Sequence, residues 1–264
     1  MSHCSTPGIV LRRRSYGDFD VIVTLMTRDH GKRTAIAKAA KKSRKRFGGL
    51  LEPFASLQVV FRLGKGMPVL EEASLVQSFD GVRTDMVKTA YGSYWLELID
   101  LWVEEKQARP ELYHLLAYVL QSLGRGHLPA AMLSLLFQIR FIGHEGLAPV
   151  LERCACCQKQ VETLPQQRFC IDLTKGGIVC QTCPAESSRR LQLSRDTLKP
   201  LQWMVDGSLE KAQRVRLGPH ALAEATHFLE TFVPYHIGRM PKSLVFLQQM
   251  RRSAKIDENP PMQI

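Results

Sequence analysis

Two cysteine pairs in the second half of the chain carry the sharpest chemical signal of the sequence. Cys154 and Cys157 form one CxxC pair, and Cys180 and Cys183 form the other. A CxxC pair on a tight turn directs two thiolates at one point, and two such turns supply the four sulfur ligands that tetrahedral Zn²⁺ accepts. The spacing predicts a zinc ribbon that holds one structural Zn²⁺. A redox pair, an iron–sulfur cluster and a site that has lost its metal remain as alternatives.

Two further cysteines complicate the choice of ligands. Cys156 lies next to Cys157 but fails the CxxC spacing with Cys154, and Cys170 lies in the middle of an expected strand. We expect Cys170 to be a small buried hydrophobic side chain. The chain has seven cysteines, an odd number, and in a reducing compartment this pattern favours metal binding over disulfides.

A catalytic centre is not expected. Four protein thiolates leave no coordination position for water, so the predicted site is structural rather than hydrolytic. The sequence has no GxxxxGK[ST], HExxH or GxSxG motif, and none of its eight histidines has an obvious partner at ligand or triad spacing. We therefore expect a protein that is not an enzyme. The enzyme alternative, a zinc-dependent nuclease or deaminase, would need an open metal position.

The N-terminal third of the chain is strongly basic. The whole chain has a net charge of +11, and residues 1–82 contain fourteen Lys and Arg against seven Asp and Glu. This balance favours a polyanionic partner, with nucleic acid ahead of an anionic membrane surface. The candidate phosphate-binding residues lie in a loop that cannot pack without burying charge, and in a nearby arginine run: Lys38, Lys41, Lys42, Arg44, Lys45, Arg46, Arg12 and Arg14.

Phe47, which follows the basic loop, has two interpretations. Its ring can stack on a base, which would make it a DNA-binding residue, or it can anchor the loop in the core of the domain. A second basic group lies near the C-terminus, from Arg239 to Arg252. We interpret it as surface charge, and a DNA track along this group is the rival interpretation.

The sequence pattern predicts an α+β protein. Five short strands are expected at residues 8–11, 21–27, 34–37, 56–63 and 69–77, with a long connection after the third. This arrangement favours a five-stranded OB-fold barrel. From Thr84 the apolar period becomes helical, and helices are expected to begin there and near Pro110, Pro129, Ser194, Pro219 and Pro241. The prediction is an OB-fold domain over 1–82 and an all-helical domain over 83–264, with the zinc ribbon inserted at about 151–186.

A membrane segment is not expected. Residues 1–7 are short and polar, and the longest uncharged stretch, between Arg125 and Arg140, is too short to cross a bilayer. We expect a cytoplasmic protein associated with the nucleoid, with a polar, frayed tail from residue 256 onward.

Taken in order, several short stretches resemble the bacterial recombination mediator family RecO. The resemblance covers nearly the whole chain, and the order of the stretches is more specific than any one of them. It implies an N-terminal OB-fold, an all-helical C-terminal domain with an inserted zinc ribbon, and no catalytic residues. Besides the CxxC pairs, the stretches are 7–11 (PGIVL), 16–20 (YGDFD), 24–31 (TLMTRDHG), 44–49 (RKRFGG), 51–54 (LEPF), 236–239 (HIGR) and 242–243 (KS).

The same resemblance implies a function and partners. It implies binding of single- and double-stranded DNA, annealing of complementary strands, and help in loading recombinase RecA onto DNA coated with single-strand-binding protein SSB. RecR, and RecF through it, are the implied partners, with the acidic, Phe-ended C-terminal tail of SSB as a further ligand. Arg140 is a candidate for binding the terminal carboxylate of that tail, and its alternative role is a surface charge or a charge that faces a helix N-terminus. An RNA- or ribosome-associated zinc-ribbon protein remains the alternative function, because OB-folds also bind RNA.

Overall fold

The computed structural model describes residues 2–184, 191–212 and 214–258, and the side chains of Arg44, Lys45, Asp206, Glu210 and residues 254–258 lie outside this description. The described chain forms two compact units, one up to His127 and again from Pro241 onward, and the other from Leu128 to Met240. The predicted domain boundary between residues 82 and 83 stays a prediction. In the described part of the chain, every helix is too short or too polar to cross a lipid bilayer.

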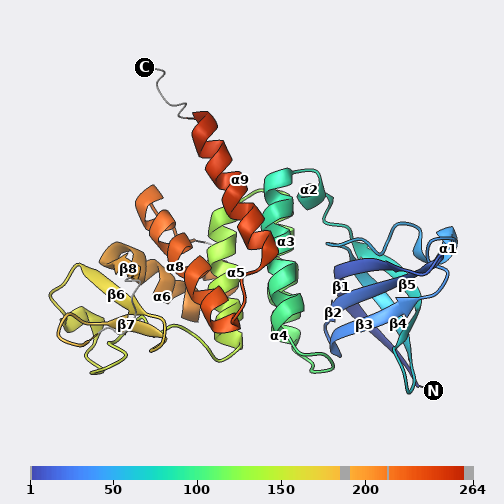
Figure 1. Ribbon diagram of the computed structural model, residues 1–264, viewed down its shortest axis with the longest axis horizontal. Coiled ribbons are helices and arrows are strands. Elements are labelled where there is room, and N and C mark those ends of the chain that lie inside the picture. The colour runs from blue at the N-terminus through green and yellow to red at the C-terminus, as the bar shows by residue number, and fades with distance from the viewer. Residues whose placement is uncertain (1, 185–190, 213, 259–264) are drawn as a thin grey trace. The chain divides into compact units, whose positions relative to one another are not determined.

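Five strands form a barrel at the N-terminal end of the chain (Figure 1). They are β1 Ser2–Tyr16, β2 Asp20–Thr27, β3 Gly31–Ala37, β4 Ser56–Leu63 and β5 Val69–Gln77. Their order is β1-β2-β3-β5-β4, and β1 also pairs with β4, which closes the sheet on itself. A single parallel bridge, Ile36 to Val69, joins β3 to β5. The predicted fold class, with five N-terminal strands followed by helices, is confirmed.

The first strand is much longer than predicted. Residues from Ser2 to Ile9 pair with β4, and residues from Gly8 to Tyr16 pair with β2, so one strand joins two neighbours. The pairing register with β2 shifts between Val10 and Arg12, where a bulge lets the strand bend from one neighbour to the other. Both ends of β1 are polar and lack apolar alternation, which is why the sequence pattern predicts only its apolar centre.

Alternating apolar side chains fill the barrel. Val23 and Leu25 of β2 and Leu57, Val59 and Phe61 of β4 are at most 1% exposed. Residues two apart on a strand point to the same face, so these side chains form the inward face of each strand. The opposite face of β4 is partly exposed, whereas the opposite face of β2, which includes Ile22 and Met26, is buried as well.

The barrel is attached to the helices of its unit at the β2–β3 turn. The Lys106 N–H donates to the carbonyl oxygen of Lys32 at 3.1 Å, and the Lys32 ammonium donates to the Asp100 carbonyl oxygen at 2.6 Å. Gly31 has a φ of +67°, and a Cβ there would lie 1.7 Å from the carbonyl oxygen of Gln107. Only glycine fits this position, because it combines a left-handed backbone with a close backbone contact.

The last helix of the chain returns to the first unit. The helices of this unit, besides a short one in the β3–β4 loop, are α2 Asp80–Arg83, α3 Met86–Trp102, α4 Pro110–Arg125 and α9 Lys242–Glu258. The Glu97 carboxylate on α3 accepts hydrogen bonds from the N–H groups of Lys242 and Ser243, at 3.0 and 2.7 Å. Glu97 thereby caps α9, which packs against α3. The helix continues to Glu258, past the point where a frayed tail is predicted, and residues 259–264 lie outside the described chain.

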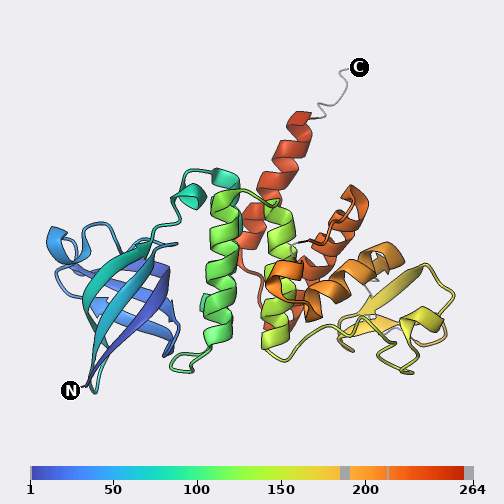
Figure 2. The same cartoon turned by 180° about the vertical axis from the view of Figure 1, so that it is seen from behind.

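The second unit combines helices with a small antiparallel sheet of order β7-β6-β8 (Figure 2). The strand expected around Cys170 is β6, which forms a hairpin with β7, whereas β8 is not predicted by the sequence. The last part of the predicted ribbon range, 185–186, lies outside the described residues. The elements are α5 Ala130–His144, the 3₁₀ helix η1 Val161–Thr163, β6 Arg168–Asp172, β7 Gly177–Val179, β8 Leu191–Ser194, α6 Arg195–Asp206, α7 Leu209–Ala212 and α8 Pro219–Ile237.

Candidate metal centre and nucleic-acid surface

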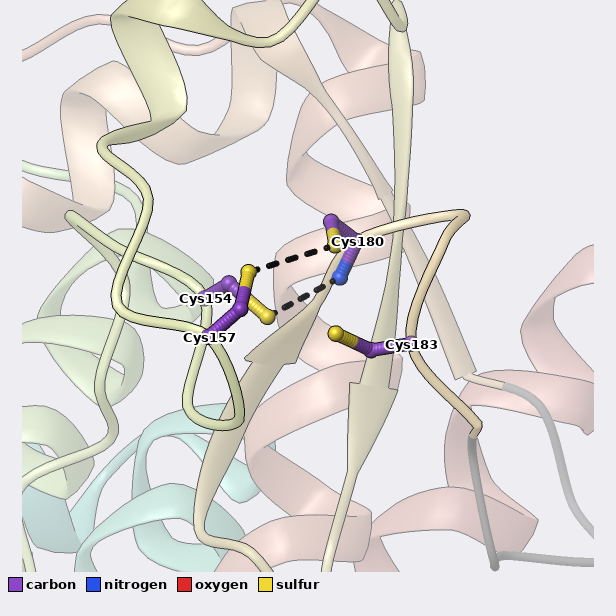
Figure 3. A group of neighbouring side chains, drawn as sticks. All are labelled: Cys154, Cys157, Cys180 and Cys183. Carbon is purple, nitrogen blue, oxygen red and sulfur yellow. Dashed lines mark hydrogen bonds between the residues drawn. The ribbon is translucent and has the colours of Figure 1, made fainter.

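The two CxxC pairs meet beside the β6–β7 hairpin (Figure 3). Cys154 and Cys157 lie on a turn that precedes the hairpin, and Cys180 and Cys183 directly follow β7. The four Sγ atoms lie within 4.8 Å of one another, and those of Cys157 and Cys180 are 3.6 Å apart. Zn–S bonds of about 2.3 Å place the sulfurs of a tetrahedral site about 3.8 Å apart. The cluster therefore has the size and the donor atoms of a four-thiolate metal site.

Backbone hydrogen bonds hold the first cysteine turn against the hairpin that carries the second. The Val150 N–H donates to the carbonyl oxygen of Gly176, and the Ile178 N–H donates to that of Val150, each at 2.9 Å. The Ala155 N–H adds a bond of 2.7 Å to the Ile178 carbonyl oxygen. A Cβ at Gly177 would lie 2.4 Å from the Val150 carbonyl oxygen, so this close crossing requires glycine.

The electrostatics of the cysteine cluster favour a bound cation. Cys154 and Cys180 are buried, and the Cys180 N–H donates to the Cys154 sulfur at 3.3 Å. A hydrogen bond with the Thr182 hydroxyl lowers the pKa of Cys180 to about 6. The hydrogen bond with Cys180 raises the pKa of Cys183 to about 12, so that thiol keeps its proton. Four thiolates at these distances repel one another, and a divalent cation is what allows all four to ionise.

The two additional cysteines lie outside the group of four. Cys156 is half-buried and packs against the cluster, but it is not among the four residues whose sulfurs converge. Cys170 lies in β6, paired with Val179 and Gln192, and is half-buried rather than fully buried as expected. The structure therefore brings together the four cysteines that the CxxC spacing selects.

The basic loop lies between β3 and β4 on the surface of the barrel. Lys38, Lys41, Lys42 and Arg46 are all exposed. Within the described part of the chain, no carboxylate forms a salt bridge with any of these four. Their charges are therefore available to an anionic partner.

Of the two interpretations of Phe47, the structure favours the anchor in the barrel core over a ring that stacks on a base. The loop ends in a short helix, α1 Arg44–Phe47, which places the Phe47 side chain in the barrel core at 2% exposure. There it packs with the buried barrel residues and anchors the loop. The driving force is the transfer of a whole aromatic ring out of water. The Arg46 guanidinium lies 5.1 Å from the centroid of this ring.

Of the three consecutive arginines in β1, two form salt bridges within the protein and the third is exposed to solvent. Arg12 forms a 2.9 Å salt bridge with Asp100 of α3, and Arg13 forms a salt bridge with Glu52. Arg14 is exposed. Arg12 and Arg14 stay predicted DNA-binding residues, and the Arg12 charge is already partly compensated.

Arg140 lies on α5 and is half-buried. Its guanidinium donates to the carbonyl oxygen of Gly207, in the connection after α6. The proposed contact with a partner carboxylate stays a prediction, and the observed bond gives Arg140 a structural partner within its own unit.

The exposed aromatic residues Tyr16, Phe19 and Trp203 are not predicted as site residues from the sequence. Tyr16 and Phe19 lie in the β1–β2 turn, and Trp203 lies on α6 with 67% of its surface exposed. For the turn, the available signal is the presence of two aromatic residues inside a Gly- and Asp-containing polar segment. For Trp203, the sequence carries no such signal, and the structure shows that its side chain is exposed.

Comparison with known proteins agrees with this architecture. The family model described as "Recombination protein O N terminal" matches residues 1–79, and "Recombination protein O C terminal" matches residues 83–244. The DNA repair protein RecO of Desulfatibacillum aliphaticivorans is 40% identical, over 96% of this chain and 99% of its own. That of Desulfosudis oleivorans is 41% identical, over 94% of this chain and 98% of its own. RecO of Bacillus subtilis is 30% identical, over 92% of this chain and 93% of its own. The chain belongs to the RecO family of recombination and DNA repair proteins.

Proposed function

We propose that this protein binds single- and double-stranded DNA through the basic loop on its barrel and anneals complementary strands, without a catalytic step of its own. The observation that carries the proposal is the exposure of Lys38, Lys41, Lys42 and Arg46 with no salt-bridge carboxylate among the described residues. Cations in this state neutralise phosphates and release counterions. Phosphate contacts carry no base information, so binding is expected to be largely independent of sequence.

Annealing follows from the same charges. Two complementary strands repel each other through their phosphates, and a protein that neutralises both lowers this barrier. The test is the rate at which labelled complementary oligonucleotides pair, with and without the full-length protein. Competition of the bound single strand with RNA of the same length then separates a DNA protein from an RNA-associated one. Failure to accelerate pairing, or a preference for RNA, would contradict the proposal.

We further propose that the protein helps to load RecA onto SSB-coated DNA, with RecR, and RecF through it, as partners. Membership of the RecO family supports this role. An apolar groove of about 520 Å³ in the second unit fits the acidic tail of SSB, because a ring can enter its apolar part while its cations bind carboxylates. The groove is lined by Pro200, Trp203, Val215, Lys199, Lys211 and Arg214.

The metal of the cysteine cluster is proposed to be Zn²⁺, one per chain, held by Cys154, Cys157, Cys180 and Cys183. Four thiolates would fill its coordination sphere, so it would stabilise the fold of the second unit rather than activate water. The chain's own part is to hold the four sulfurs within 4.8 Å of one another by the backbone bonds described above. We also propose the domain boundary at 82/83 and a cytoplasmic, nucleoid-associated location, where the DNA is.

A further inference from the structure

The β1–β2 turn exposes two aromatic side chains close together in the sequence. Tyr16 is 54% exposed and Phe19 is 45% exposed. Tyr16 pairs with Asp20 at the end of the hairpin, and Gly17, between Tyr16 and Phe19 in the sequence, has a left-handed φ of +55° with no atom within 4 Å of an added Cβ. Phe is among the residues most often fully buried, and Tyr is intermediate. Two exposed rings in one tight turn therefore suggest a surface that is covered by a ligand.

The turn is fixed against the basic loop rather than free. The Asp20 carboxylate accepts a hydrogen bond from the Ala39 N–H at 2.7 Å, and the Lys41 N–H donates to the Phe19 carbonyl oxygen at 3.0 Å. The Lys41 ammonium donates to the Gly17 carbonyl oxygen, also at 3.0 Å. These bonds place the aromatic turn and the cations of the loop on one surface of the barrel, with their positions set before any ligand arrives.

One of the rings is also in direct contact with a loop cation. The Lys42 Nζ lies 3.4 Å from the centroid of the Phe19 ring, a cation–π contact. The Phe19 side chain remains 45% exposed, so Lys42 covers only part of it. An aromatic ring flanked by lysines, with no salt-bridge carboxylate on those lysines among the described residues, matches a ligand that combines flat apolar groups with negative charge.

We propose that Tyr16 and Phe19 are a stacking platform for the bases of single-stranded nucleic acid, whose phosphates the basic loop binds. This inference rests on the proposed function and adds a base-dependent component to it. Stacking on an aromatic ring is tolerant of base identity, so it strengthens binding without giving sequence preference. In a duplex the bases are stacked on one another, so the platform acts on single strands and the charges act on both forms.

The test compares two ligands that have the same phosphates, an oligo-dT and an abasic oligonucleotide of equal length. Full-length protein is titrated with each over a range of salt concentrations. The variants are Tyr16→Ala with Phe19→Ala, and the conservative exchange Tyr16→Phe with Phe19→Tyr. Phe246→Ala on α9, a ring that is 52% exposed, is the matched control. Melting temperatures verify that each variant is folded.

The wild type is expected to bind oligo-dT more tightly than the abasic strand. The double alanine variant should lose about 10-fold in oligo-dT affinity for each ring removed. It should keep its abasic affinity and the same slope of log K against log salt, while the conservative exchange and Phe246→Ala retain the base preference. If the wild type has no base preference, or the alanine variant keeps it, the platform is refuted and phosphate binding stands, with the turn left to a protein partner. If the wild type binds neither ligand, the proposed DNA-binding function itself fails.

Discussion

At the scale of single residues, the four cysteines give the most specific prediction, which concerns a bound metal. Purified protein is expected to contain about one Zn²⁺ per chain, because the four sulfurs lie within 4.8 Å of one another. Cys154→Ser or Cys183→Ser should release the metal. Because metal binding and folding are coupled, each substitution should also destabilise the second unit by about 3 kcal/mol or more. Metal content by mass spectrometry and the melting temperature measure both effects.

The matched control for these variants is Cys170→Ser. This thiol is half-buried in β6 and does not belong to the four converging sulfurs, so its replacement should leave the metal content at one per chain. A Cys183→Ser protein that keeps its metal and its melting temperature would refute the four-thiolate assignment.

A second residue with a strong local effect is Glu224 on α8, which joins three elements of the second unit. Its carboxylate accepts hydrogen bonds from the Thr197 hydroxyl at 2.6 Å and from the Ser194 hydroxyl and N–H at 2.7 and 3.0 Å. It also forms a 2.9 Å salt bridge with Arg168. Burial alone would raise the pKa of Glu224, but these bonds and the Arg168 charge outweigh burial and lower it from 4.5 to about 2.

The lowered pKa gives the stability of the protein a defined pH dependence. A carboxylate whose pKa is lower in the folded state stabilises it fully above about pH 4.5, and the contribution disappears as the pH falls toward 2. At neutral pH this contribution is about 3 kcal/mol. Urea unfolding of the wild type and Glu224→Gln should therefore differ at pH 6, and by about 1 kcal/mol less at pH 3.5. Acid protonates the thiolates of both proteins alike, so a difference that is the same at both pH values would contradict this role.

At the scale of the elements, Gly31 is the point where the barrel is attached to the α3–α4 connection. Gly31→Ala should destabilise the protein by about 2–4 kcal/mol, because it adds a strained positive φ and a clash with the Gln107 backbone. Gly146→Ala is the matched control: its φ is also positive, at +76°, but no atom lies within 4 Å of the added Cβ. It should cost only about 1 kcal/mol. Equal losses in urea unfolding of the two variants would mean that backbone strain alone matters at Gly31.

The elements that can be predicted from the sequence are those with a local pattern. The fourth and fifth strands have the predicted bounds, Ser56–Leu63 and Val69–Gln77, because their apolar residues recur along the strand and turns flank them. The polar N-terminal part of β1 and the short strand β8 lack such a pattern, since partner strands far along the chain define them. The cap that Glu97 provides to α9 joins residues more than a hundred positions apart, which no local signal encodes.

The candidate sites divide in the same way. CxxC spacing is a local constraint, so the converging cysteines could be predicted before the structure was known. The charge of the basic loop was predictable for the same reason. The direction in which a side chain points could not be predicted from the sequence. Phe47 points inward and is buried, whereas Phe19 remains exposed. Which way each ring points depends on the closure of the barrel, and residues distant in the sequence determine it.

At the scale of the whole molecule, we expect DNA affinity to reside in the basic loop. The rival interpretation is that DNA binds along the C-terminal basic group, from Arg239 to Arg252. The claim predicts that neutralising the loop weakens binding to every DNA sequence about equally, since the loop binds phosphates. Folding stability should hardly change, because exposed charges contribute little to it. The rival variant, with an equal number of charges removed, serves as the matched control.

The most direct test is the slope of log K against log salt for full-length protein on single-stranded and duplex DNA. One variant carries Lys41→Gln, Lys42→Gln, Arg44→Gln and Arg46→Gln, and the rival variant carries Arg239→Gln, Lys242→Gln, Arg251→Gln and Arg252→Gln. For each phosphate that is no longer neutralised, the loop variant should flatten the slope by about 0.7 on single strands and about 0.9 on duplex. The rival variant should keep the wild-type slope. An unchanged slope and affinity in the loop variant, with a flattened slope in the rival variant, would contradict the claim.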